Sequence, residues 1–234
     1  MKTILLFVTG MLMATMIFSQ NIKEYTNVEI AAPQFKSELF ESINDFLINA
    51  VQYPSQSKNM GLQGTEVVEF KVTTDGRIKE FAIVNSISTE IDHEVIRVLK
   101  ITDGKWKPGL ANGEPVEMKK EVSVTFIAAS EKELIKEAKD LQERGNRWMF
   151  VKNNPEKAIK YYDQGIRLLP FEESLLAARG LCKYELGDTE GALADWQRIN
   201  GINETKRSEA SLNLAGNYTK LSGYKEMLTT LKNR

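Results

Sequence analysis

The hydrophobic pattern changes its period near residue 129, and this change constrains the fold more than any other feature. Before it, apolar and polar residues alternate over short runs, which is typical of half-buried strands. After it, a triplet of two small residues and one aromatic residue recurs at a spacing near 34 residues. The two triplets are Gly145, Ala158 and Tyr162, and then Gly180, Ala192 and Trp196. The pattern predicts a mixed α and β unit followed by stacked helix pairs.

The first unit, over 35–128, is expected to be an α+β two-layer domain. Two helices on one face of a three-stranded antiparallel sheet would bury its apolar stripes economically. Tyr53-Pro54 ends the first helix, Asp75-Gly76 predicts a two-residue hairpin turn, and 106–113 is expected to be a connecting loop. The expected elements are a helix over 40–50, strands over 68–72 and 77–86, a helix over 91–99 and a strand over 122–126.

The second unit, over 131–234, resembles the tetratricopeptide repeat, a helix–turn–helix unit of about 34 residues. Small residues would let paired helices approach closely, and the aromatic residue would fill the space beside them. Repeats are expected over 138–170 and 173–204, with a truncated unit over 208–233. First helices of such repeats line a concave groove. The candidate groove residues are Asn146, Met149, Lys183, Asn213 and Asn217. The alternative is a structural stack that only docks onto the first unit.

The first residues are predicted to be a secretory signal peptide over 1–19. Lys2 precedes an uncharged, mostly apolar run over 4–18, which suits a signal core of 7–15 residues better than a membrane span of about 20. A short linker over 20–34 would follow. The mature chain is therefore expected outside the cytoplasm. The alternative is an uncleaved segment that anchors the chain in the inner membrane.

Composition excludes most catalytic and metal chemistry. The chain has one cysteine, Cys182, and one histidine, His93, whereas a zinc site of these residues needs about four ligands. We expect no cofactor, no metal and no enzyme; the rival reading is an enzyme that uses His93. The net charge of -1 provides no basic field for nucleic acid. The charge divides mildly, with 11 basic and 14 acidic residues over 33–128 and 18 and 16 over 129–234, which favours contact between the halves.

An ordered set of short motifs over 35–128 resembles the C-terminal domain of TonB, the periplasmic energy transducer of Gram-negative bacteria. The motifs are Tyr53-Pro54, 64–72, Asp75-Gly76-Arg77-Ile78, Ile91-Asp92, 95–99, Trp106-Lys107-Pro108-Gly109, Gly113, Pro115-Val116 and 122–126. The resemblance implies a small α/β fold that binds an extended segment of an outer-membrane receptor as an added strand. It also implies that Tyr53 and Pro54 lie near the bound segment.

The resemblance therefore indicates a binding edge along the last strand of the sheet. The unpaired backbone groups of an edge strand can accept an incoming peptide. The alternative is that the chain itself or a homodimer covers this edge. The candidate edge residues are Glu121, Val122, Ser123, Val124, Thr125, Phe126 and Ile127.

Two functions are consistent with these sequence features. The first is a periplasmic binding or scaffold protein whose partners are a TonB-dependent outer-membrane receptor or another envelope protein. The second is a genuine energy transducer that retains 4–18 as its anchor. Only 14 residues separate Gln20 from Phe35, which reach about 45 Å even at the 3.1 Å per residue of a polyproline spacer. The short spacer favours the first function.

Overall fold

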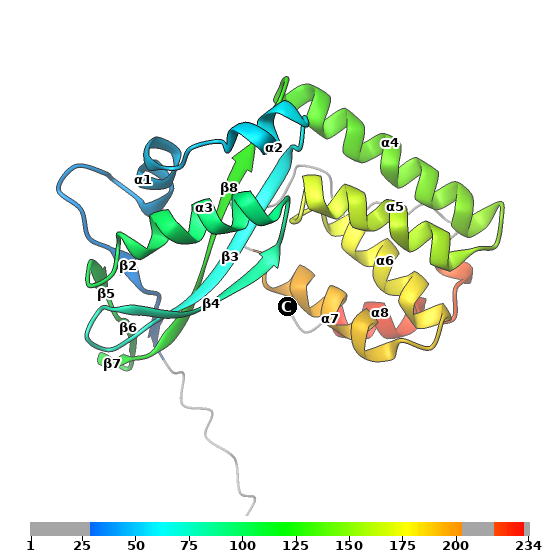
Figure 1. Cartoon of the computed structure of the whole chain (residues 1–234). Helices are drawn as coiled ribbons and strands as arrows, with labels where there is room; N and C mark the ends of the chain where they lie inside the picture. The colour runs from blue at the N-terminus through cyan, green and yellow to red at the C-terminus, as the bar shows by residue number, and fades with distance from the viewer. Residues whose placement is uncertain (1–28, 203–217, 232–234) are drawn as a thin grey trace, which may run out of the picture.

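The computed structural model describes residues 29–202 and 218–231. A twisted sheet carries helices α1 to α3 on one side, and the helical region α4 to α8 lies on the other side (Figure 1). The expected signal peptide, residues 20–28 of the expected linker, and the first part of the third repeat fall outside the described residues.

Strand β3 (Gly64–Val72) is the centre of the sheet, whose order is β4-β3-β8. It pairs antiparallel with β4 (Ile78–Asn85) and with β8 (Met118–Phe126). Helices α1 (Ile43–Ala50) and α3 (Thr89–Lys100) cover one face. The predicted three-stranded antiparallel sheet with two helices is confirmed.

The apolar stripes read from the sequence form the core of this unit. Alternate side chains of β3 at Val68, Phe70 and Val72 are fully buried against the helices, as strand periodicity requires. Serine residues cap the two helices: the Ser42 hydroxyl accepts the Asp45 amide, and the Ser88 hydroxyl accepts the Ile91 amide.

Several short elements were not expected from the sequence. A small helix, α2 (Ser55–Asn59), begins directly after Pro54, whereas α1 has already ended at Ala50, so the proline does not itself terminate that helix. The expected loop over 106–113 contains strands, and the final residues of the expected linker pair with them. These strands are β1 (Ile30–Ala31), β2 (Gln34–Phe35), β5 (Trp106–Lys107), β6 (Gly109–Ala111) and β7 (Glu114–Val116), paired β1 with β6, β2 with β5 and β6 with β7.

The turn between β3 and β4 is wider than predicted. Only Gly76 has a positive φ, of 80°, whereas Asp75 does not, and the two strands are joined across 73–77. A backbone hydrogen bond from the Gly76 amide to the Thr73 carbonyl closes the turn. The hairpin prediction is thus confirmed, and its two-residue length is wrong.

The helical region consists of antiparallel helix pairs with close crossings. A Cβ on Gly145 would lie 2.5 Å from the Tyr162 ring, and one on Gly180 would overlap the Trp196 indole. Both rings are fully buried, so each glycine leaves room for the aromatic residue of the facing helix. The described elements are α4 (Glu131–Phe150), α5 (Pro155–Leu168), α6 (Glu173–Glu185), α7 (Thr189–Asn200), a 3-10 helix (Tyr218–Lys220) and α8 (Tyr224–Leu231).

The end of α5 docks onto the start of β3. The last backbone carbonyl groups of α5 have no hydrogen-bond partner inside the helix. The sheet supplies donors: the Asn85 amide group donates to the Arg167 carbonyl at 3.1 Å, and the Thr65 hydroxyl donates to the Leu168 carbonyl at 3.2 Å. Gly64 allows the close approach, because a Cβ there would lie 2.6 Å from the Arg167 oxygen. The two units therefore pack together through specific contacts.

The same end of β3 buries a carboxyl group. Glu66 is fully buried, and its Oε2 accepts the Ile87 amide at 3.0 Å. Burial raises the pKa of Glu66 to about 8, and the neighbouring Asp92 carboxyl adds to this rise. The side chain is therefore mainly protonated at neutral pH.

Glu66→Gln should remove a pH dependence of stability. An acid whose pKa rises from 4.5 to about 8 on folding binds more protons in the folded state within that window, so stability falls as pH rises through it and levels off above it. Thermal melts from pH 4 to 9 would show this fall in the parent chain and a flatter profile in the variant. Equal slopes in both chains would contradict the assignment.

Gly145→Ala should destabilise the helical region by about 1–3 kcal/mol, because the new methyl group must displace the buried Tyr162 ring. Urea unfolding would measure the loss. Gly201→Ala is the matched control: its Cβ would find its nearest atom at 3.5 Å, and its φ is -82°. A similar loss in both variants would show that the close crossing is not the cause.

Candidate functional site

Strand β8 buries alternate side chains under the helices, and its pairing with β3 is regular. Its side chains at Val122, Val124 and Phe126 are buried on the helix side, and those at Ser123 and Thr125 lie on the other face. The register with β3 runs without a shift from Gly64 opposite Phe126 to Val72 opposite Met118. Among the described strands β8 pairs with β3 alone, so β8 is a straight edge strand of the sheet.

The opposite edge, β4, has a different construction. Its pairing with β3 shifts twice, between Val67 and Val68 and again between Glu69 and Lys71. Glu80 within it has a left-handed φ of 53°, which is uncommon for this residue type. Bulges and charged side chains are the features by which proteins protect an edge from further pairing. β4 carries both, with Lys79 bound to Glu117 at 2.7 Å.

The predicted edge residues do not all lie in equivalent places. β8 ends at Phe126, so Ile127 lies one residue beyond the strand. Glu121 binds Arg198 of α7 through a 3.1 Å ion pair, which ties the middle of β8 to the helical region. The stretch over 122–126 is the part of the predicted edge that remains a candidate for pairing.

Tyr53 and Pro54 lie beside the end of this stretch. The Tyr53 ring meets the Phe126 ring edge to face, with centroids 5.1 Å apart, and its hydroxyl donates to the Leu62 carbonyl. Burial raises the pKa of Tyr53. The loop over 52–55, the Tyr53-Pro54 loop, is therefore fixed against the last residue of β8.

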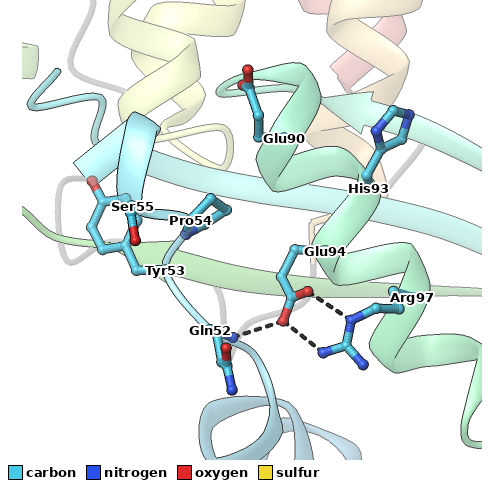
Figure 2. Close-up of a pocket in the computed structure, with 8 residues that line it drawn as sticks. All are labelled: Gln52, Tyr53, Pro54, Ser55, Glu90, His93, Glu94 and Arg97. Carbon is cyan, nitrogen blue, oxygen red and sulfur yellow. Dashed lines mark hydrogen bonds and ion pairs between the residues drawn. The ribbon is translucent and has the colours of Figure 1, made fainter. Parts of the chain in front are cut away.

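The Tyr53-Pro54 loop also forms one wall of a shallow pocket of about 320 Å³ (Figure 2). The other wall is the outer face of α3. This pocket, the loop–α3 pocket, was not predicted. Its lining residues are Gln52, Tyr53, Pro54 and Ser55 from the loop and Glu90, His93, Glu94 and Arg97 from α3.

Glu94 holds the two walls together. Its carboxylate accepts two hydrogen bonds from Arg97 at 2.8 Å each and one from the Gln52 amide at 2.9 Å (Figure 2). Hydrogen bonding by Arg97 lowers the pKa of Glu94, so the carboxylate stays ionised at neutral pH. The pair is neutral overall and fixes the position of the loop.

A sequence signal for this pocket does exist. Its α3 residues are spaced i, i+3, i+4 and i+7 from Glu90, which places them on one helical face. The stripe is polar and lies beside the apolar stripe that was used to predict the helix. His93 is exposed and also lines the pocket.

The three predicted groove residues that the structure describes make contacts within the helical region. Asn146 accepts hydrogen bonds from the Tyr162 hydroxyl at 2.8 Å and from the Tyr218 hydroxyl. Met149 is buried in the helical core, so it is not a surface residue. Lys183 forms an ion pair with Asp195 at 3.0 Å. The remaining two, Asn213 and Asn217, fall outside the described residues.

Within the described ranges the side chains offer little other chemistry. No group of three or more His, Cys, Asp or Glu residues there could hold a metal ion. None of the helices described is long and apolar enough to cross a membrane. Cys182 is fully buried, and burial raises its pKa to about 12.

Residues 49–128 match the family model described as Gram-negative bacterial TonB protein C-terminal. This part of the chain is a TonB C-terminal domain. The match covers β3, β4, β8 and the Tyr53-Pro54 loop. The TonB C-terminal domain family is non-catalytic and implies interaction with outer-membrane receptors.

Two solved structures of the TonB C-terminal domain of Helicobacter pylori are similar to this chain. The first, over its residues 194-285, has 19% identity and a TM-score of 0.30, and the match covers 38% of this chain and 92% of that one. The second, over its residues 179-285, has 15% identity and a TM-score of 0.29, with 36% and 76% covered. Comparison of the chain with curated proteins gives no match.

Glu94→Ala should release the Tyr53-Pro54 loop from α3. The Gln52 amide loses its acceptor, so its hydrogen exchange should accelerate roughly fivefold, as expected for one hydrogen bond of about 1 kcal/mol. Amide exchange followed by NMR measures this. Glu90→Ala, which lines the same pocket, is the control and should leave Gln52 unchanged; unchanged exchange in Glu94→Ala would contradict the clamp.

Proposed function

We propose that this protein is a periplasmic binding or scaffold protein whose β8 edge takes up an extended segment of an outer-membrane receptor or another envelope protein. The observation that carries the proposal is the regular β8 edge in a TonB C-terminal domain. An added strand gains affinity from backbone hydrogen bonds and specificity from alternate side chains. The family of the domain supports the periplasmic location.

The difference between the two edges supports β8 rather than β4 as the docking strand. An incoming strand needs a run of evenly oriented N–H and C=O groups. β8 keeps an unshifted register over its whole length, whereas β4 is interrupted by two shifts and by the left-handed Glu80. Tyr53 and Pro54 stand at the end of β8, where a bound segment would leave the sheet.

We further propose that the helical region is a tetratricopeptide-type stack that offers a second protein-interaction surface. The two equivalent crossings, Gly145 against Tyr162 and Gly180 against Trp196, support the repeat. Because Met149 and Asn146 are engaged in the packing, the surface would involve other residues of α4 and α6 than those two. The contacts of α5 with β3 would hold both binding surfaces in one fixed arrangement.

The binding edge can be tested from the side of the ligand. The probes are short synthetic peptides from the N-terminal periplasmic segments of TonB-dependent outer-membrane receptors, measured by calorimetry. In the tightest peptide, each backbone amide is methylated in turn. Only every second residue of an added strand forms backbone hydrogen bonds with the neighbouring strand, so affinity should fall about tenfold or more at alternate positions. A loss without this period of two, or no binding by any peptide, would overturn the proposal.

Disulfide trapping then identifies the edge. Cys182 is buried, so the chain offers a background without a reactive thiol. Thr125→Cys on β8 should crosslink to cysteine-bearing forms of the same peptide. Val84→Cys on β4 is the matched control, because its side chain is also exposed. Preferential crosslinking at Val84→Cys would show that the segment pairs with β4, and the assignment to β8 would be wrong.

A further inference from the structure

The loop–α3 pocket lies one loop away from the proposed binding edge. Tyr53 belongs to the lining of the pocket and also touches Phe126, the last residue of β8. A segment paired with β8 would therefore pass the Tyr53-Pro54 loop as it leaves the sheet, and residues just outside the paired stretch come within reach of the pocket.

The charges of the pocket select the kind of side chain that fits. Glu94 and Arg97 neutralise each other, and their hydrogen bonds hold the pocket in shape. Glu90 stands one helical turn before Glu94, and its exposed carboxylate has no ion-pair partner among the described residues. The unbalanced charge at this site is therefore negative.

The other wall suits the stem of a long side chain. The half-buried Pro54 presents its ring on the loop side, facing α3, whereas the Tyr53 ring points away from α3 toward Phe126 (Figure 2). Lysine and arginine place their methylene groups along such surfaces while their charged heads stay in water. A cationic side chain would thus find an apolar wall for its stem and a carboxylate for its head.

We propose that the loop–α3 pocket takes a lysine or arginine side chain from the segment that binds to β8, with its stem on Pro54 and its head at Glu90. This inference rests on the proposed function and adds a specificity determinant to it. It predicts that bound segments carry a basic residue just beyond the stretch paired with β8.

A substitution scan of the ligand tests the proposal. In the tightest receptor-derived peptide, each position outside the paired stretch is replaced in turn by arginine, glutamine and glutamate. One position should bind in the order arginine, glutamine, glutamate, with steps of about two- to fivefold, as expected for an exposed ion pair. No such position, or a preference for glutamate, would overturn the proposal.

A double-mutant cycle locates the effect. With Glu90→Gln, the advantage of arginine over glutamine at that position should disappear. Glu114→Gln is the matched control, because it removes the same charge from an exposed residue of β7 and should preserve the advantage. Loss of the advantage in both variants would show a general charge effect and overturn the proposal.

The two proposals fail in different ways. If no peptide shows the alternating effect of amide methylation, binding at β8 is wrong. If the peptide crosslinks to Thr125→Cys but shows no preference for a basic residue, β8 binding stands and the pocket assignment is wrong.

Discussion

The rest of the structure depends on the burial of β3 from both faces. Val68, Phe70 and Val72 pack beneath the helices of the first unit, and β4 and β8 flank the strand. On its other face, Thr65 receives the end of α5 through the Leu168 carbonyl. Because one strand joins the sheet, the helix layer and the helical region, the position of β8 relative to all of them is fixed.

The two edges of the sheet differ in their backbone structure. β4 carries the bulges and the strained Glu80, features that prevent further pairing. β8 keeps a regular edge, with Arg198 of the helical region bound to Glu121 at its middle and the Tyr53-Pro54 loop at its end. The proposed binding uses backbone pairing and helix surfaces, which need neither histidine nor cysteine.

The larger elements could be predicted from the sequence because each rests on a local pattern. Alternation marks β3, and the apolar stripe at Ile91, Val95 and Val98 marks α3. The small strands β1, β2, β5, β6 and β7 span two or three residues each, too short for any period to show. The close helix crossings could be predicted because small and aromatic residues recur together in the sequence at a fixed spacing.

The candidate site was predictable only in part. The last strand and Tyr53 followed from alternation and from the resemblance to the TonB domain. The loop–α3 pocket and the burial of Met149 depend on how distant segments meet, because the loop over 52–55 is held to α3 by one side chain, Glu94. A polar stripe on a helix indicates a surface, and only the tertiary structure shows that a loop forms the opposite wall.

Pairing of a peptide with β8 is measured most directly by isotope-edited nuclear Overhauser effects in the complex of the full chain with a receptor-derived peptide. If the segment adds to β8, cross-strand contacts should join peptide backbone protons to the backbone of residues 122–126. Contacts to β4, or to the helical region alone, would contradict this pairing.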